Sequence, residues 1–356
     1  MIGASATMLM SSAMAVPLSY SVTNIGNHGL TATMGAALND YGHVVVNSGN
    51  ASTGRAFTYA NGAYSMLEYF GGIDRAYDIN SSGQVTGSAT DPTRSLGRQA
   101  YLHADGVTTS LGTLGGKTSK GTALNESGHV VGYADLAEQY VTHAFMYKDG
   151  AMQDLGTLGG KISRAYAVNA HGDVAGFSTD AAYNTRSFLY TNGAMQELEM
   201  FGGLDSWAQG INDNGIVVGY AFSGDDVRAY RHADGLAFDL GSLGGSSSAA
   251  FAVNNAGAIV GYSTLGSNQD AGFLWEGGKM YDLNALIGRD LGWTIRAGLD
   301  INSRGQILVD ACHVDTGCNA LLLTPNEVPE PSTPATLLAA ALAMFGGLAL
   351  RRTLGK

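Results

Sequence analysis

Four side chains that could bind an acidic ligand recur at regular intervals along this chain. Arg75, Lys120, Arg164 and Trp207 each stand five residues before an asparagine of a repeated pattern. Guanidinium and ammonium groups donate charge-assisted hydrogen bonds to carboxylates, and an indole offers an apolar face for stacking. If the repeat places these side chains around one opening, we expect them to bind an acidic sugar or another carboxylate. The alternative is that they only solvate a rim.

The sequence provides little for other chemistries. The net charge is −11 and no stretch is dense in Lys and Arg, which argues against nucleic acid as a partner. Residues 111–118 resemble part of a phosphate-binding loop, but the first glycine of that motif falls at Leu111. The eight histidines are scattered, and neither a calcium loop nor a G-x-S-x-G elbow occurs. We therefore predict no metal, no cofactor and no catalytic residue.

The spacing of the two cysteines, Cys312 and Cys318, fits no four-ligand zinc site. They fall in the segment between a strand expected to end near Asp310 and one expected to begin near Asn319. A disulfide across that short loop is the expectation for an exported protein.

A single unit is repeated seven times. It contains an aliphatic residue, Asn, two variable residues, Gly, any residue, and then Val or Ile. The asparagines are 41 to 48 residues apart. They are Asn39, Asn80, Asn125, Asn169, Asn212, Asn254 and Asn302. An Asn that begins a turn and a Gly that ends it predict a hairpin between two short strands.

Each unit contains a second hairpin signal, such as Asp149-Gly150 or Asn192-Gly193. These dipeptides favour type I′ turns, so each unit holds four short strands. Four strands per 40–45 residues is typical of propeller blades. The 51 glycines and the 14% share of charged residues fit such a turn-rich, tightly packed protein. The sequence thus predicts an all-β, seven-bladed β-propeller of four-stranded blades.

The ends of the chain are expected to close this propeller. A strand over residues 20–25 would be the outer strand of the last blade and pair with a C-terminal strand over 320–323. The residue four before each repeated Asn is always Gly or Ala. Crowding around a central axis would favour such small side chains, so we expect that strand to be innermost. The link between blades is either the LGTLGG segment or the variable loop after the GYxD strand, and an innermost first strand favours the LGTLGG segment.

The triplet His143-Ala144-Phe145, with its following Asp-Gly turn and Asn-xx-Gly hairpin, resembles the extracellular HAF repeat. Some version of the unit covers residues 20–323. The resemblance implies secretion and a repeat scaffold without established catalytic residues. Residues 1–15 fit a signal peptide, because they are small and apolar and end in Ala13-Met14-Ala15.

The C-terminus carries a second targeting segment. Pro329-Glu330-Pro331 is followed by an apolar run over 335–350 and then by Arg351 and Arg352. This order resembles the PEP-CTERM sorting signal of Gram-negative, exopolysaccharide-producing bacteria. The resemblance implies export, a transient anchor in the inner membrane through a helix within 328–356, recognition by an exosortase, and removal of the tail. The propeller would then occupy residues 16–327.

Three functions fit this sequence. The first is a non-catalytic interaction module at the cell surface or in the extracellular matrix, associated with exopolysaccharide. The second is a propeller enzyme, a lyase or hydrolase acting on extracellular polysaccharide. That function would need a carboxylate pair, or a Tyr or His with an Arg, that breaks the symmetry of the repeat near the axis, and the sequence identifies none. The third is a lectin-like binder of acidic glycans that uses the four side chains named first.

Overall fold

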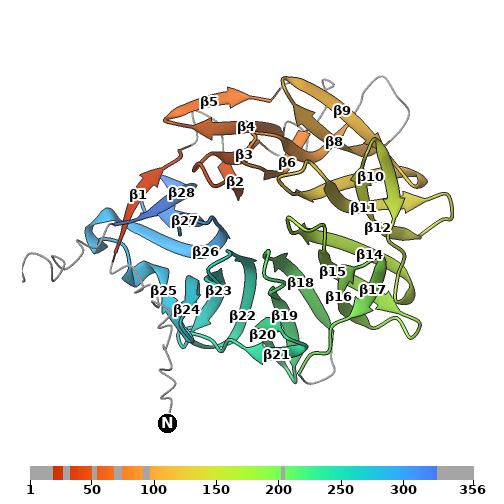
Figure 1. Cartoon of the computed structure of the whole chain (residues 1–356). Helices are drawn as coiled ribbons and strands as arrows, with labels where there is room; N and C mark the ends of the chain where they lie inside the picture. The colour runs from red at the N-terminus through yellow and green to blue at the C-terminus, as the bar shows by residue number, and fades with distance from the viewer. Residues whose placement is uncertain are drawn as a thin grey trace, which may run out of the picture.

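The protein is an all-β structure, as predicted. The computed structural model describes residues 19–26, 33–49, 54–67, 74–90, 97–201 and 205–326. These residues form β-strands and two short 3₁₀ helices. Figure 1 shows the sheets following one another around a common centre in the order of the chain. The signal peptide over 1–15 and the sorting signal over 328–356 lie outside the described residues.

The strands form three four-stranded and two eight-stranded sheets. The first four-stranded sheet contains β2 (Thr33–Leu38), β3 (Val44–Ser48), β4 (Arg55–Ala60) and β5 (Ala63–Met66). The second contains β6 (Asp74–Ile79), β7 (Val85–Thr90), β8 (Arg98–Ala104) and β9 (Val107–Gly112). The third contains β26 (Trp293–Ile301), β27 (Ile307–His313), β28 (Gly317–Pro325) and β1 (Tyr20–Asn24).

Each eight-stranded sheet consists of two four-stranded antiparallel units. The first sheet comprises β10 (Gly115–Leu124), β11 (Val130–Leu136), β12 (Thr142–Lys148), β13 (Ala151–Asp154), β14 (Gly159–Val168), β15 (Val174–Asp180), β16 (Thr185–Thr191) and β17 (Ala194–Glu197). The second comprises β18 (Ser206–Ile211), β19 (Val217–Ser223), β20 (Asp226–Ala233), β21 (Leu236–Asp239), β22 (Gly244–Val253), β23 (Ile259–Leu265), β24 (Asp270–Glu276) and β25 (Lys279–Asp282). One parallel pair joins the units in each sheet, Thr142 with Ile162 and Val227 with Ser247.

The asparagine of each repeat shapes the first hairpin through its side chain. In the turn after β2, Asn39 Oδ1 accepts hydrogen bonds from the backbone N–H groups of Tyr41 and His43, at 3.0 and 2.9 Å. Gly42 then takes a φ of 83°, in the left-handed region that disfavours side chains. The predicted Asn-xx-Gly hairpin is confirmed.

The second hairpin has the expected mirror-image turn. Asp149 and Gly150 have φ values of 52° and 78°, as a type I′ turn requires. The fourth strand that follows leads through the LGTLGG segment into the first strand of the next unit, because β13 pairs with β12 and β14 pairs with β15.

The third strand of each unit carries the largest core side chain. Phe145, the aromatic residue of the His-Ala-Phe triplet, is fully buried. The equivalent residues of four other units are fully buried as well: Tyr101, Phe188, Tyr230 and Phe273. In the first unit Phe57 is half-buried, and in the last unit the position is taken by the buried Leu321. The repeated aromatic position therefore marks the core between neighbouring sheets.

The reason given above for the small residue before each Asn is wrong. Ala76 and Ala165 are fully buried, and a Cβ at Gly298 would lie 2.9 Å from the Cβ of Val260 in the preceding unit. The close neighbour is thus the adjacent sheet, and the axis does not impose the small side chain. The residues that line the centre stand two and three positions before each Asn.

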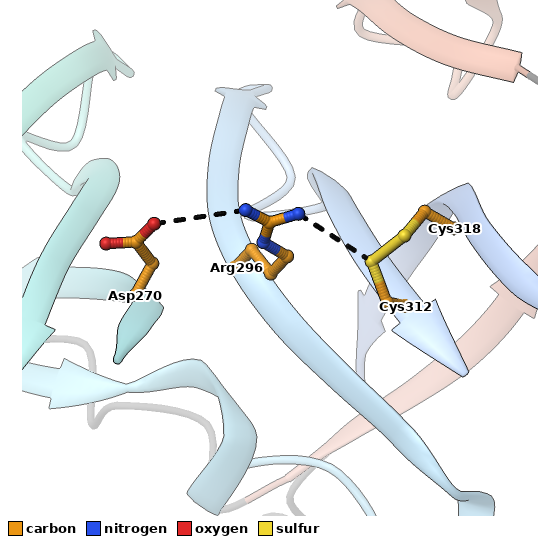
Figure 2. The surroundings of a disulfide bond; sticks show 4 residues. All are labelled: Asp270, Arg296, Cys312 and Cys318. Carbon is orange, nitrogen blue, oxygen red and sulfur yellow. Dashed lines mark hydrogen bonds and ion pairs between the residues drawn. A yellow bond between two sulfur atoms is a disulfide. The ribbon is translucent and has the colours of Figure 1, made fainter. Parts of the chain in front are cut away.

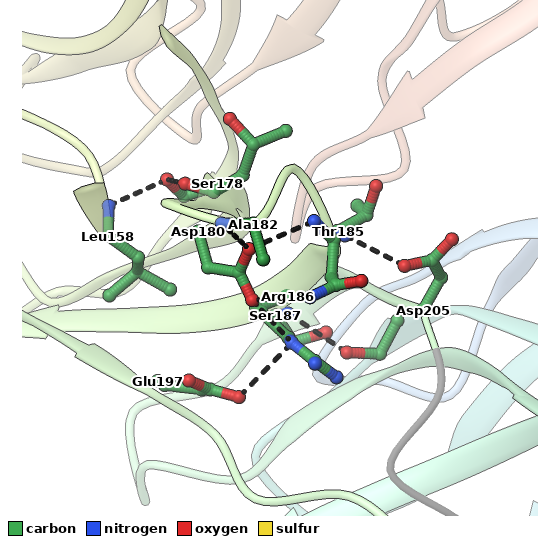
Figure 3. Close-up of polar contacts among 12 residues, drawn as sticks. Leu158, Ser178, Asp180, Ala182, Thr185, Arg186, Ser187, Glu197 and Asp205 are labelled. Carbon is green, nitrogen blue, oxygen red and sulfur yellow. Dashed lines mark hydrogen bonds and ion pairs between the residues drawn. The ribbon is translucent and has the colours of Figure 1, made fainter. Parts of the chain in front are cut away.

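Hydrogen bonds join neighbouring units at their third strands. The N–H of Ala144 donates to Ser163 Oγ at 2.8 Å, and the N–H of Ser187 donates to Ser206 Oγ at 2.9 Å. Figure 3 shows a companion bond, in which the N–H of Thr185 donates to Asp205 at 2.8 Å. A serine in the inner strand of the next unit therefore fixes one unit against the next.

The first and last described strands lie in one sheet. Strand β1 pairs antiparallel with β28, with Tyr20 opposite Pro325. The N–H of Asn326 donates to the carbonyl of Ser19 at 3.0 Å, which extends the pairing by one step. The expected pairing of the N- and C-terminal strands is found. Among the described residues, no helix has the length and apolar character needed to cross a membrane.

Candidate functional site

A ring of hydrogen bonds links the seven repeated asparagines at one end of the inner strands. Each side-chain amide donates to the backbone carbonyl of the asparagine in the next unit, at 2.9 to 3.3 Å. The last bond runs from Asn302 to Asn39 at 3.0 Å and returns to the first unit. We call these seven residues the asparagine ring.

The asparagine ring is a structural feature. Its members are only 3 to 7% exposed. In Asn169, Oδ1 accepts the N–H groups of His171 and Asp173 while the amide reaches the next unit. Each such hydrogen bond contributes about 1 kcal/mol, and a buried group that loses its partner costs about 1–3 kcal/mol. The side chains that surround this end of the axis are therefore already used within the fold.

The predicted ligand-binding residues lie five positions before the ring asparagines, in β6, β10, β14 and β18. That places them roughly 16 Å along the strands from the asparagine ring. We define the cationic mouth as Lys120, Arg164 and Trp207 together with the rings of Tyr77, Tyr133, Phe177 and Tyr220.

Lys120 and Arg164 are surrounded by aromatic rings. The ammonium of Lys120 lies 3.7 Å from the centre of the Tyr77 ring and 5.9 Å from that of Tyr133. The guanidinium of Arg164 lies 4.6 Å from the Tyr133 ring and 5.8 Å from that of Phe177. Both cations are half-buried. Such contacts stabilise a cation by about 0.5–2 kcal/mol without neutralising its charge.

Trp207 continues this row of rings. Its indole is stacked on Tyr220 at 5.2 Å and meets Phe177 edge-on at 6.4 Å. Within the described residues, neither Lys120 nor Arg164 forms an ion pair with a carboxylate, and the buried Arg164 Nε has no hydrogen-bond partner. The cationic mouth thus presents two uncompensated positive charges beside an aromatic surface.

Arg75 does not join this group. Its guanidinium lies against Gly54 in the preceding unit, where a Cβ would approach within 2.6 Å of Nη1. Of the four predicted residues, the structure brings three together, and the fourth faces the neighbouring sheet.

A carboxylate pair in the centre was missed in the sequence. Asp78 and Asp300 stand two residues before their ring asparagines, and both line a central cavity of about 230 Å³. The other five units have only Ala or Gly at this position: Ala37, Ala123, Ala167, Gly210 and Ala252. The signal was therefore present in an alignment of the repeats with one another.

Both carboxyl groups also bind backbone of the next unit. Asp78 Oδ2 accepts the N–H of Leu124 and Asp300 Oδ2 accepts the N–H of Leu38, each at 2.8 Å. Burial raises the pKa of Asp78 to about 8, against the opposing effect of its backbone hydrogen bonds. Burial likewise raises the pKa of Asp300 to about 6. Near neutral pH the two groups therefore favour different protonation states.

The two cysteines lie in strands, and the expectation that they fall in a loop is wrong. Cys312 in β27 and Cys318 in β28 are cross-strand partners joined by a disulfide. Figure 2 shows Arg296 between this disulfide and Asp270. In the described part of the chain, no group of three or more His, Cys, Asp or Glu residues is arranged to hold a metal ion.

Residues 327–352 match the family model of the PEP-CTERM protein-sorting motif. The motif indicates an exported protein that is processed at its C-terminus, and it implies recognition by exosortase-type sorting machinery. The predicted residues Pro329, Glu330, Pro331, Arg351 and Arg352 all fall within the matched segment. No match is found among curated protein sequences.

The chain is similar to several solved structures at low sequence identity. TolB from Acinetobacter baumannii is 11% identical, with 80% of each chain covered and a TM-score of 0.44. The β-propeller domain of the trilobed protease from Pyrococcus furiosus is 11% identical, with 71% of this chain and 98% of that chain covered and a TM-score of 0.39.

The acylaminoacyl peptidase from Pyrococcus horikoshii aligns with a TM-score of 0.58 at 11% identity, over 88% of this chain and 55% of that chain. The chain thus spans about half the length of that peptidase. At such identity the likeness concerns the fold alone.

Proposed function

We propose that this chain is an exported, non-catalytic binding module that holds an acidic saccharide at the cationic mouth. In this proposal residues 16–327 form a seven-bladed β-propeller of HAF-type repeats. The segment 1–15 is the signal peptide, and 328–356 is a sorting tail with a membrane-spanning helix. The mature protein lies at the surface of a Gram-negative cell, associated with exopolysaccharide.

Contacts between the last and first units support a closed ring of seven blades. Asn302 donates to the carbonyl of Asn39, and Asp300 accepts the N–H of Leu38. The pairing of β1 with β28 adds the missing outer strand to the last unit. A closed ring leaves no sheet edge at the centre and fixes the side chains of the mouth relative to one another.

The observation that carries the binding proposal is the pair of uncompensated cations, Lys120 and Arg164, among aromatic rings. A uronate ring has a carboxylate for the cations and an apolar C–H face for the indole of Trp207. The protein as a whole is acidic and repels anions in general. An acidic ligand is therefore attracted only where the local positive charges of the mouth lie.

The test is retention of the purified mature domain on immobilised polygalacturonate, with neutral dextran as the matched matrix. We expect retention on polygalacturonate only, and weaker retention as salt is raised, because screening weakens charge attraction. Equal retention on both matrices, or on neither, would overturn the proposal. The length of the polymer is measured in the same experiment.

A second function is favoured by one observation, the pair Asp78 and Asp300 in the central cavity. Carboxyl groups whose pKa values are pushed apart are typical of acid–base pairs in glycoside hydrolysis. If the protein is such an enzyme, the polymer shortens in its presence, and the variants Asp78→Asn and Asp300→Asn lose this activity. Polymer of unchanged length with wild-type protein would exclude this function for the tested substrate.

A further inference from the structure

The junction between the units of β22–β25 and β26–β28 contains a large groove. Its volume is about 550 Å³, whereas the two cavities on the axis measure about 240 and 230 Å³. Small-molecule sites usually measure about 300–1,000 Å³. By size, the groove between these units is the better ligand site among the described cavities.

A change in the inner strand β26 opens this junction. In β22, Ser248 occupies the position opposite Ser263 and bonds the N–H of Ala229 in the preceding unit. The residue in the equivalent register of β26 is Ile295, which cannot make that bond. The register then skips Arg296, so this residue is an extra one in a β-bulge. Bulges re-aim a side chain, and here the guanidinium of Arg296 lines the groove.

The second change is a ten-residue connection between β25 and β26, which contains the 3₁₀ helices η1 (Leu283–Ala285) and η2 (Arg289–Leu291). This connection is held firmly. Leu283 is fully buried, and Asn284 exchanges two hydrogen bonds with the backbone of Ile295, at 2.7 and 3.0 Å. The wall of the groove is therefore already formed without a ligand.

The two arginines of the groove are only loosely engaged, whereas Asp282 Oδ1 accepts the backbone and side-chain N–H groups of Asn284 at 2.8 and 2.9 Å. Arg296 lies between Asp270 and the disulfide (Figure 2), with Nη2 4.0 Å from Asp270 Oδ2 and Nη1 4.0 Å from Cys312 Sγ. The first of these distances is too long for a hydrogen bond. Arg289 is exposed and forms no ion pair within the described ranges. Trp293 is half-buried, and His313 packs against it edge-on at 5.1 Å. Donors, acceptors and an aromatic surface thus border one space.

We propose that this groove is a second ligand site and that it binds a neutral saccharide ring. Two guanidinium groups, from Arg289 and Arg296, face two carboxyl groups, from Asp270 and Asp282, so the lining carries no net charge. Sugar hydroxyls can both donate to the carboxylates and accept from the guanidinium groups, while a pyranose C–H face packs on Trp293. The cationic mouth offers no carboxylate among its members, so the two sites select different ligands.

The test uses the indole N–H signals of protein labelled with ¹⁵N-tryptophan, of which there are three: Trp207, Trp275 and Trp293. The variant Trp293→Phe assigns the signal of the groove. Methyl glycosides of glucose, galactose and mannose are titrated separately to tens of millimolar. We expect at least one of them to shift the Trp293 signal saturably and to leave that of Trp207 unchanged.

Two sets of variants complete the test. Arg289→Gln with Arg296→Gln should weaken binding about tenfold or more, because each removes a charged hydrogen-bond donor. Arg304→Gln is the matched control, since that arginine lies over Tyr41 beside the asparagine ring. Lys120→Ala with Arg164→Ala should leave the titration unchanged, which separates this site from the proposed function. Absence of a saturable Trp293 shift with all three glycosides, or equal affinity in the arginine variants, would overturn the proposal.

Discussion

The two ends of the central axis are built from the same strands but are used differently. At the asparagine ring all seven units carry the same residue, and the amide of each is bonded to the next unit. At the cationic mouth the equivalent positions differ from unit to unit, and two cations have no carboxylate partner among the residues that the structure describes. A position that carries the same residue in all seven units therefore stabilises the fold, whereas a position whose residue differs between units is available for ligand binding.

This comparison also explains the low density of charge in the protein. Neighbouring sheets pack face to face over buried aromatic residues such as Phe145 and Phe188. Charged side chains have no place in those interfaces, because an unpaired buried charge is costly. The cations of the mouth are tolerated since aromatic faces and partial exposure stabilise them.

The largest effect is expected from a break in the asparagine ring. The change Asn212→Ala removes the bond to Asn254, which measures 2.9 Å, and the two bonds that Oδ1 accepts in its own turn. We expect the free energy of unfolding in urea to fall by about 3 kcal/mol. Gln196→Ala, which removes an exposed amide from β17, is the control and should change it by less than about 0.5 kcal/mol. A loss as small as that of the control would contradict the structural role of the ring.

A smaller change separates the two roles of the same residue. Asn212→Asp keeps an oxygen that can accept the turn hydrogen bonds from Asn214 and Ile216 but cannot donate to Asn254 when ionised. At low pH the aspartate is protonated, and we expect Asn212→Asp to lose less stability than Asn212→Ala. At neutral pH we expect Asn212→Asp to lose more stability than it does at low pH. Identical losses at both pH values would show that the bond between units contributes little.

A third experiment concerns Asp78, whose carboxyl group lies in the central cavity between the asparagine ring and the cationic mouth. Because the pKa of Asp78 is raised by burial to about 8, the folded state binds a proton that the unfolded state has released between about pH 4 and 8. This carboxyl group therefore stabilises the fold at low pH, and its contribution is lost as the pH rises towards 8. Asp78→Asn should flatten the fall in unfolding free energy over this range.

The readout is the urea midpoint measured from pH 4 to 9 for wild type and Asp78→Asn. Asp149→Asn, at an exposed turn that asparagine also fits, serves as the comparison for loss of a carboxylate at the surface. Parallel curves for wild type and Asp78→Asn would contradict a raised pKa at this position.

The local features of the fold could be predicted from the sequence, and the contacts between units could not. Asn39 and Gly42 determine a turn with the residues directly around them, so their spacing predicted the hairpin. The bond from the side chain of Asn39 to the carbonyl of Asn80 joins residues 41 positions apart, and no local pattern signals it. The same holds for the small residue at Gly298, whose neighbour is Val260 of another sheet.

The candidate sites were partly predictable for the same reason. Lys120, Arg164 and Trp207 share a repeat position in the first strands of successive units, so the period predicted their proximity. Arg75 has the same period but faces Gly54, because its direction depends on the neighbouring sheet. The groove beside Trp293 depends on a bulge and on a connection unique to one junction, and a repeat pattern contains no information about either.

The central claim is that the cationic mouth binds an acidic saccharide and that the asparagine ring stabilises the fold. The most direct measurement is a calorimetric titration of tri-galacturonate into the double variant Lys120→Ala, Arg164→Ala. The titration is done at a temperature where urea unfolding shows the double variant to be as stable as wild type within about 1 kcal/mol. We predict that affinity falls at least tenfold, because two charge-assisted contacts are lost. Wild-type affinity in this variant would contradict the account.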